Sequence, residues 1–106
     1  MTEFARLSNF EVAPGRTDDA VAFFAETDLG GASDAGGFRR AFWLLDRSSG
    51  KGVELVIFDS KDAMDAAAGD EAAARSKASS SGITMSAEQS YEVVAEGRPV
   101  GELAPV

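Results

Sequence analysis

"FRRAFWLLDRSSGKGVELVIFDS", residues 38–60, predicts a β-hairpin. Two runs rich in aromatic and β-branched residues, 38–46 and 51–59, flank the polar loop "RSSG". Gly50 stands where a four-residue loop often needs a positive φ. With Asp46 and Lys51 as partners, Leu44 pairs with Val53, Phe42 with Leu55 and Arg40 with Ile57.

Both faces of this hairpin are apolar. One face carries Phe38, Arg40, Phe42, Leu44, Val53, Leu55 and Ile57. The other carries Arg39, Ala41, Trp43, Leu45, Glu54, Val56 and Phe58. Two helices of a small domain cover only one of these faces, and the other leaves an apolar patch that soluble monomers rarely expose. We therefore expect a two-fold homodimer through the open sheet face. The alternative is a monomer whose C-terminal tail folds over that face.

The flanking segments predict the remaining elements. A strand over residues 3–12 alternates, with Phe4, Arg6, Ser8, Phe10 and Val12 on one face. A helix follows with Thr17 as its N-cap, and a second helix, capped by Ser60, is interrupted at Gly69. Residues 90–96 predict a last strand, and the tail, residues 97–106, holds two prolines and predicts no regular element.

This order of elements is strand, helix, strand, strand, helix, strand. It predicts an α+β, ferredoxin-like βαββαβ fold, with a four-stranded antiparallel sheet and two helices on one face. The chain of 106 residues has the length of one domain, and no repeat or linker divides it.

Composition excludes several kinds of site. The chain has no cysteine and no histidine, which excludes disulfides, thiol catalysis, Ser-His-Asp catalysis and His-ligated metal or haem. Acid–base chemistry is left to Asp, Glu, Lys, Tyr or water. The net charge of −8 and the scattered Lys and Arg residues argue against nucleic acid or an anionic membrane as a partner. We expect a cytoplasmic protein with a small-molecule or protein partner.

The segment "GFRRAFWLLDRSSGKGVELVIFDSKDAM", residues 37–64, resembles a family pattern. The pattern is Gly-Phe…Asp-Arg-x-Ser-Gly-Lys…(Trp/Phe)-x-Ser-x-x-Ala-Met, and it is found in antibiotic-biosynthesis-monooxygenase-like proteins of the dimeric α+β barrel superfamily. Its motifs mark a turn and a helix cap, so they support the fold more strongly than the activity. The resemblance implies a barrel of two sheets at a dimer interface and a ligand cleft between the sheet and the helices of each protomer.

By this resemblance, the face with Trp43 and Phe58 looks toward the helices. The family includes cofactor-free oxygenases of phenolic compounds, so the resemblance implies a monooxygenase-like protein that needs no metal or cofactor. A deprotonated aromatic substrate passes an electron to oxygen, and the protein supplies a dry pocket and a proton acceptor. The candidate catalytic residues are Glu54, a base if burial raises its pKa, and Tyr91. The candidate substrate-binding residues are Ser8, Arg39, Trp43 and Phe58.

Each of these residues also has a structural interpretation. Trp43 can belong to the core, Glu54 can pair with an arginine, and Arg39 can be a solvated rim charge. The alternatives are therefore a catalytically silent dimer that binds a small ligand or a partner, and an isomerase or cyclase on the same scaffold. Haem degradation is excluded, because Ser8 and Phe58 stand where the haem-degrading branch uses Asn and Trp, and no His is present.

Overall fold

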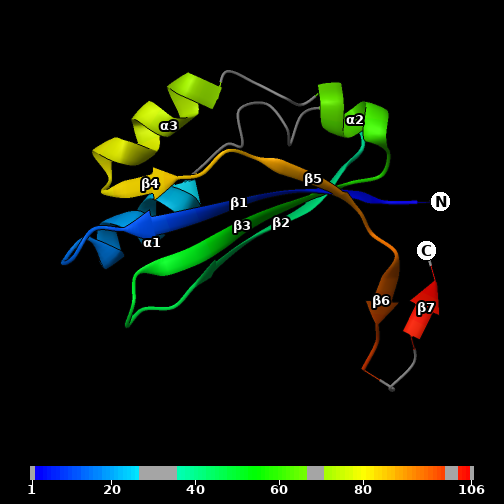
Figure 1. Cartoon of the computed structure of the whole chain (residues 1–106), viewed down its shortest axis with the longest axis horizontal. Coiled ribbons are helices and arrows are strands. Elements are labelled where there is room, and N and C mark those ends of the chain that lie inside the picture. Colours follow the sequence, from blue (N-terminus) through cyan, green and yellow to red (C-terminus); the bar gives the residue numbers. More distant parts are fainter. Residues whose placement is uncertain (1, 27–35, 67–70, 100–102, 106) are drawn as a thin grey trace.

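The structure is a computed structural model that describes residues 2–26, 36–66, 71–99 and 103–105. These residues form, in chain order, β1 (Phe4–Val12), α1 (Thr17–Glu26), β2 (Phe38–Leu45), β3 (Lys51–Phe58), α2 (Lys61–Ala66), α3 (Glu71–Ser80), β4 (Ile83–Met85), β5 (Gln89–Glu92), β6 (Ala95–Gly97) and β7 (Leu103–Pro105) (Figure 1). No described helix is both long and apolar enough to span a bilayer.

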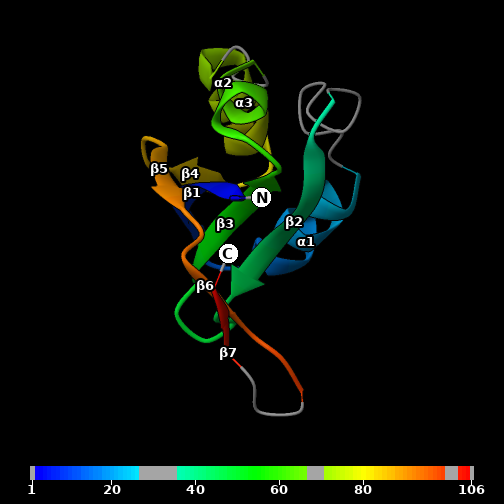
Figure 2. The same ribbon diagram turned by 90° about the vertical axis from the view of Figure 1, so that its right-hand side faces the viewer.

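The main sheet is antiparallel, and its strands run in the order β2-β3-β1-β4. Strand β5 pairs with the other end of the same edge of β1 that β4 uses. The helices lie on one side of this sheet, and β6 and β7 lie on the other (Figures 1 and 2). The α+β class with helices on one face of an antiparallel sheet is therefore confirmed.

The predicted elements near the C-terminus are wrong in detail. The single strand expected over residues 90–96 is divided between β5 and β6, and β4 was not expected at all. The tail was expected to be irregular, yet Gly97 and residues 103–105 belong to a small antiparallel hairpin formed by β6 and β7. We call this hairpin the C-terminal arm. The two prolines do not prevent this pairing, because Pro99 lies outside both strands and Pro105 is the last residue of β7.

Helix caps and turns follow the local chemistry. Ser60 caps α2, and its Oγ accepts a hydrogen bond from the Ala63 amide at 3.0 Å. Thr17 is the first helical residue instead of the cap, because the Arg16 carbonyl accepts the first intrahelical bond, from Ala20. Gly69, the predicted break in the second helix, lies outside the described residues.

The central hairpin has the predicted pairing. Asp46 donates its amide to the Lys51 carbonyl, and Gly50 has a φ of 76°. Phe42 lies opposite Leu55, and Leu44 opposite Val53. A register shift between Phe38 and Arg40 changes the end of β2.

This shift corrects the predicted faces of two residues. Arg39 is the extra residue of a bulge, and Phe38 lies opposite Phe58 and packs on the helix side, not on the open face. The two rings meet edge-on at 6.3 Å. An aromatic side chain thereby joins the core, while the charged Arg39 stays at the surface.

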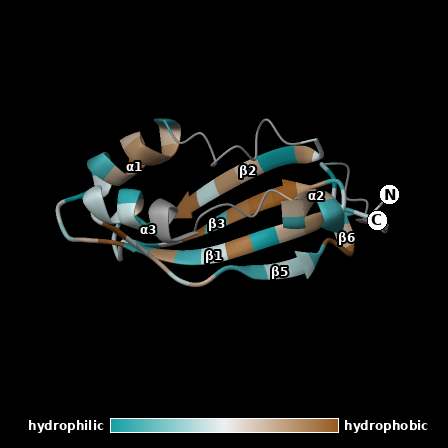
Figure 3. Ribbon diagram, turned by 90° about the horizontal axis from the view of Figure 1, so that it is seen from above, coloured by the Kyte–Doolittle hydropathy of each residue, from teal (hydrophilic) through white to brown (hydrophobic). Residues whose placement is uncertain are grey.

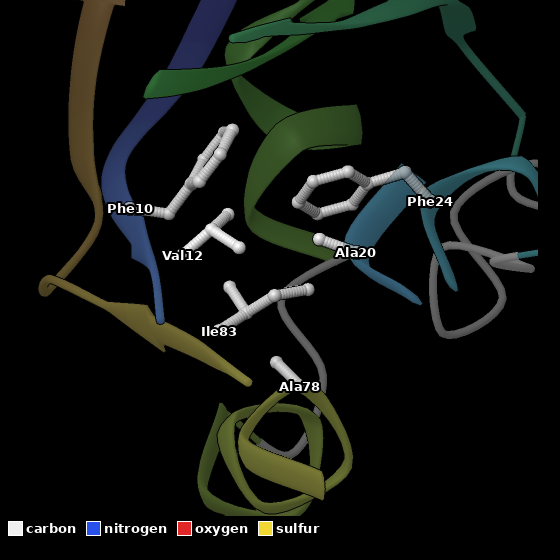
Figure 4. Close-up of a cluster of buried hydrophobic side chains, with 6 residues drawn as sticks. All are labelled: Phe10, Val12, Ala20, Phe24, Ala78 and Ile83. Atoms are coloured by element: carbon white, nitrogen blue, oxygen red, sulfur yellow. The ribbon is translucent and has the colours of Figure 1, made fainter. Parts of the chain in front are cut away.

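Two buried clusters hold the helices on the sheet. At one end, α1, α3 and the sheet meet through side chains that point toward one another (Figure 4): Phe10, Val12, Ala20, Phe24, Ala78 and Ile83. At the other end, Met64 of α2 packs on Val56 and Phe58. Strand β3 is largely hydrophobic (Figure 3), as expected for a strand that lies between β1 and β2 in the sheet.

The face of the sheet away from the helices is called here the open face. Its residues on β2 include Phe42, which is 43% exposed, and Leu44, which is 56% exposed. The C-terminal arm stands on the same side, and among the described residues its strands pair only with each other (Figure 2).

Candidate functional site

A groove of about 550 Å³ lies between α1 and β2. Its lining residues are Val21, Phe24 and Ala25 from α1 and Phe38, Arg40, Ala41, Trp43 and Leu45 from β2. Most of the lining is aliphatic or aromatic, and Arg40 is the charged residue among these eight. Such a lining suits a small, largely apolar ligand.

Two of the aromatic rings in the groove wall stack on each other. Phe24 and Trp43 stack with their centroids 5.6 Å apart and their planes 21° apart. Phe24 is buried, because Ala20 and Phe24 form the face that α1 turns to the core. Trp43 is half-buried, so part of its ring stays available to a molecule in the groove.

The indole of Trp43 is held by a carboxylate. Its Nε1 donates a hydrogen bond to Glu54 Oε2 at 2.7 Å, and the two residues lie directly opposite on β2 and β3. Ser8 on β1 lies opposite Glu54 in turn, and it is buried. Ser8, Glu54 and Trp43 therefore form a row across three strands on the helix side, as the alternation of the sequence predicts.

This row is only partly a groove wall. Trp43 lines the groove, whereas Glu54 and Ser8 are not among its lining residues. The Glu54 carboxylate is therefore connected to the groove only indirectly, through its hydrogen bond to the Trp43 indole.

Phe58 and Arg39 lie away from the groove. Phe58 is fully buried in the cluster with Met64, so its ring is part of the core. Arg39 projects from the bulge, about half exposed, with Nη2 3.9 Å from Asp59 Oδ2. Neither residue lines the groove.

Tyr91 lies on the opposite face of the sheet from Trp43. It pairs with Ala5 of β1, which alternation places on the open face. Its ring is half exposed, and its hydroxyl donates to Gln89 Oε1 at 2.6 Å. The structure therefore does not bring Tyr91 together with Glu54 and Trp43, because the register of β5 on β1 sets its face.

Sequence reasoning did not select two arginines near these residues. Arg40 lines the groove from the edge strand, with Nη2 3.7 Å from Glu3 Oε1. Arg6 lies on the helix side next to Ser8; its side chain is 14% exposed, with Nε 3.0 Å from Glu88 Oε2. The alternation of residues 3–12 already placed Arg6 on the same face as Ser8, so the sequence contained the information needed to select it.

The described residues hold no group of three or more Asp and Glu side chains placed to ligate a metal ion. The Ser48 hydroxyl lowers the pKa of Asp46, and the Asp65 carboxylate raises the pKa of Lys61; both groups lie outside the groove lining.

Solved structures of other proteins share this architecture. SnoaB, a cofactor-independent oxygenase from Streptomyces nogalater, matches with a TM-score of 0.66 at 19% identity, over 93% of this chain and 99% of that one. The ActVA-Orf6 monooxygenase of Streptomyces coelicolor, solved with nanaomycin D, matches with a TM-score of 0.64 at 18% identity, over 92% and 90%.

The chain has the fold of the antibiotic biosynthesis monooxygenases. A protein of unknown function from Nitrosomonas europaea has the same fold, with a TM-score of 0.66 at 24% identity, over 95% of this chain and 98% of that one. No model of a known protein family matches the sequence, and no curated protein matches it. The protein thus shares the fold of these monooxygenases, and a shared fold does not determine its chemistry.

Proposed function

We propose that this protein is a cofactor-independent, monooxygenase-like enzyme that binds a small phenolic aromatic in the groove between α1 and β2. The observation that carries the proposal is the stacked pair of Phe24 and Trp43 in the groove wall. An aromatic wall fits a flat ring, which gains dispersion and quadrupole contacts there. The oxygenase described for the similar fold of SnoaB supports the proposed type of reaction.

The reaction needs molecular oxygen and the substrate alone. A phenol loses its proton to solvent water, and the phenolate passes an electron to O₂. The resulting ring radical and superoxide combine and take up a proton to form a ring hydroperoxide. Loss of the proton on that ring carbon and cleavage of the O–O bond leave one oxygen atom on the ring as a quinone carbonyl and release the other as water. For 1,5-dihydroxynaphthalene the balance is one substrate and one O₂ giving juglone and one water, with four electrons taken from the ring. The groove contributes a largely apolar wall that favours the departure of water from the ring.

A silent ligand-binding protein is the second candidate. It is favoured by one observation: Arg40 is the ionisable residue of the groove lining, and it already faces Glu3. A bound phenol would then meet no side-chain base directly, and binding without turnover would result.

Oxygen consumption separates the two candidates. The purified protein is incubated with 1,5-dihydroxynaphthalene in air-saturated buffer, with heat-denatured protein as the control. We expect O₂ uptake to match juglone formation mole for mole, and Trp43→Leu to lose both. Binding of the phenol with no uptake above the control would favour the silent protein.

We infer further that the protein works as a homodimer, with a second copy on the open face. Phe42 and Leu44 expose apolar surface there, which is costly in water. The C-terminal arm projects into the space beside this face and pairs with no other described strand of its own chain (Figure 1). A second copy would cover the apolar face and give the arm a surface to pack against.

A further inference from the structure

The contact between Trp43 and Glu54 fixes one end of the indole. The donor and acceptor atoms are 2.7 Å apart, at the short end of the range for N–H···O hydrogen bonds. The bond joins adjacent strands at directly opposed positions, so the backbone of the hairpin sets the distance between the two side chains.

The ring is held on a second side as well. Phe24 stacks on one face of the indole, and Phe24 is itself fixed by its contact with Phe10 at 4.9 Å. A tryptophan side chain has two rotatable bonds. Stacking restrains the plane of the ring, and the hydrogen bond restrains its rotation within that plane. The orientation that Trp43 presents to the groove thus depends on both neighbours.

Glu54 has no place in the groove lining. Its effect on a bound molecule must therefore pass through Trp43. This geometry differs from that of a general base, which needs hydrogen-bond contact with the proton that it removes.

We propose that Glu54 is a positioning residue that holds the Trp43 ring in the orientation required by an aromatic ligand. This role rests on the proposed function, because it concerns the same groove, and it assigns Glu54 a task other than proton transfer. The indole N–H is satisfied by the carboxylate, so the ring faces the ligand as a fixed apolar plate. Without the acceptor, the half-buried N–H would turn toward water or toward the ligand.

The indole N–H gives a direct measurement in the free protein. Trp43 is the only tryptophan of the chain, so ¹⁵N-labelled protein gives one indole cross-peak. The variants are Glu54→Leu, which removes the acceptor, and Glu54→Gln, which keeps an acceptor oxygen without the charge. Glu88→Gln is the matched control, since its carboxylate pairs with Arg6 on the same side of the sheet.

We expect Glu54→Leu to speed hydrogen exchange of the indole by about tenfold and to weaken juglone binding by about fivefold, the scale of one lost hydrogen bond. Glu54→Gln should restore both to within about twofold of wild type, since it can still accept the bond. Glu88→Gln should change neither. If Glu54→Leu does not fold, Glu54→Ala makes the same comparison.

The failures of the two proposals are distinguishable. If the hydrogen-exchange rate of the Trp43 indole N–H is the same in Glu54→Leu as in wild type, the positioning role is overturned, whether or not juglone binds. Equal loss of juglone binding in Glu54→Gln and Glu54→Leu also overturns it, because the charge and not the ring orientation would then matter. Wild-type protein that binds neither juglone nor 1,5-dihydroxynaphthalene refutes the proposed function, while the indole signal still decides the role of Glu54.

Discussion

Phe24 of α1 and Trp43 of β2 stack at 5.6 Å, and this contact joins the helix to an edge strand of the sheet. Helix α1 therefore has two tasks at this point. It closes the core through Phe24, and it forms one wall of the groove.

Replacing Phe24 should weaken both the fold and the groove. We expect Phe24→Ala to lower the free energy of unfolding by about 3–5 kcal/mol, because a buried ring leaves a cavity. Urea denaturation measures the loss. Val21→Ala is the control from the same helix and groove; Val21 is 38% exposed, so its loss should stay below about 1 kcal/mol. Similar losses in the two variants would contradict the packing described for Phe24.

A charge on the open face should separate the dimer. Leu44 is 56% exposed in a single chain, so Leu44→Asp should leave the fold intact and give monomers, since a second copy would bury the unpaired charge. Light scattering should report about twice the 11.0 kDa chain mass for wild type and the single mass for the variant. Ala22→Asp puts the same charge on an exposed position of α1 and should stay dimeric. A monomeric wild type at all concentrations would refute the dimer.

The hairpin loop should require glycine at position 50. A Cβ there would stand 2.7 Å from the Val12 carbonyl oxygen, and the φ of 76° is strained for other residues. We expect Gly50→Ala to cost about 2–4 kcal/mol, the sum of backbone strain and displaced strand β1. Gly15→Ala is the control, since Gly15 has a φ of 78° and a Cβ at that position would meet no atom within 4 Å. Gly15→Ala should lower the free energy of unfolding by about 1 kcal/mol. Equal melting temperatures of the two variants would contradict this explanation.

Asp46 should titrate below its usual range. The Ser48 hydroxyl and then the Ser48 amide donate to its carboxylate, which lowers the pKa of Asp46 from 3.8. A lowered folded-state pKa stabilises the fold above the unfolded value, and this contribution is lost as pH falls through the folded value. Ser48→Ala should raise the pKa of Asp46 toward 3.8, as followed by the carboxyl-carbon shift between pH 2 and 6. No change in that titration would show that the hydroxyl does not hold the charge.

Alternation and turn chemistry were sufficient to predict the central hairpin. The partners of Phe42 and Leu44 follow from the loop, and the cap at Ser60 follows from its place before a helical run. The bulge at Arg39 was not predictable in this way, because one extra residue leaves no mark on the pattern of apolar positions.

The candidate site was predicted less well than the fold. Trp43 and Glu54 are opposed in the predicted register, so their proximity follows from the sequence; the direction of the indole N–H does not, because rotamers depend on packing by α1. Tyr91 was misplaced because its face depends on how the short strand β5 meets β1, a contact distant in sequence.

The central place of β1 has a consequence for how the chain is made. Residues 4–11 pair with residues 51–58, and residues 4–7 and 10–12 pair with residues 89–92 and 83–85. Strand β1 leaves the ribosome before any of these partners exists. One of its edges stays unpaired until residue 58 has followed, and the other until residue 92 has followed. Pairings so distant in sequence form slowly, and an unpaired strand is a site of aggregation. The polar residues of β1, among them Arg6, Asn9 and Glu11, therefore disfavour association of this strand with other chains during synthesis.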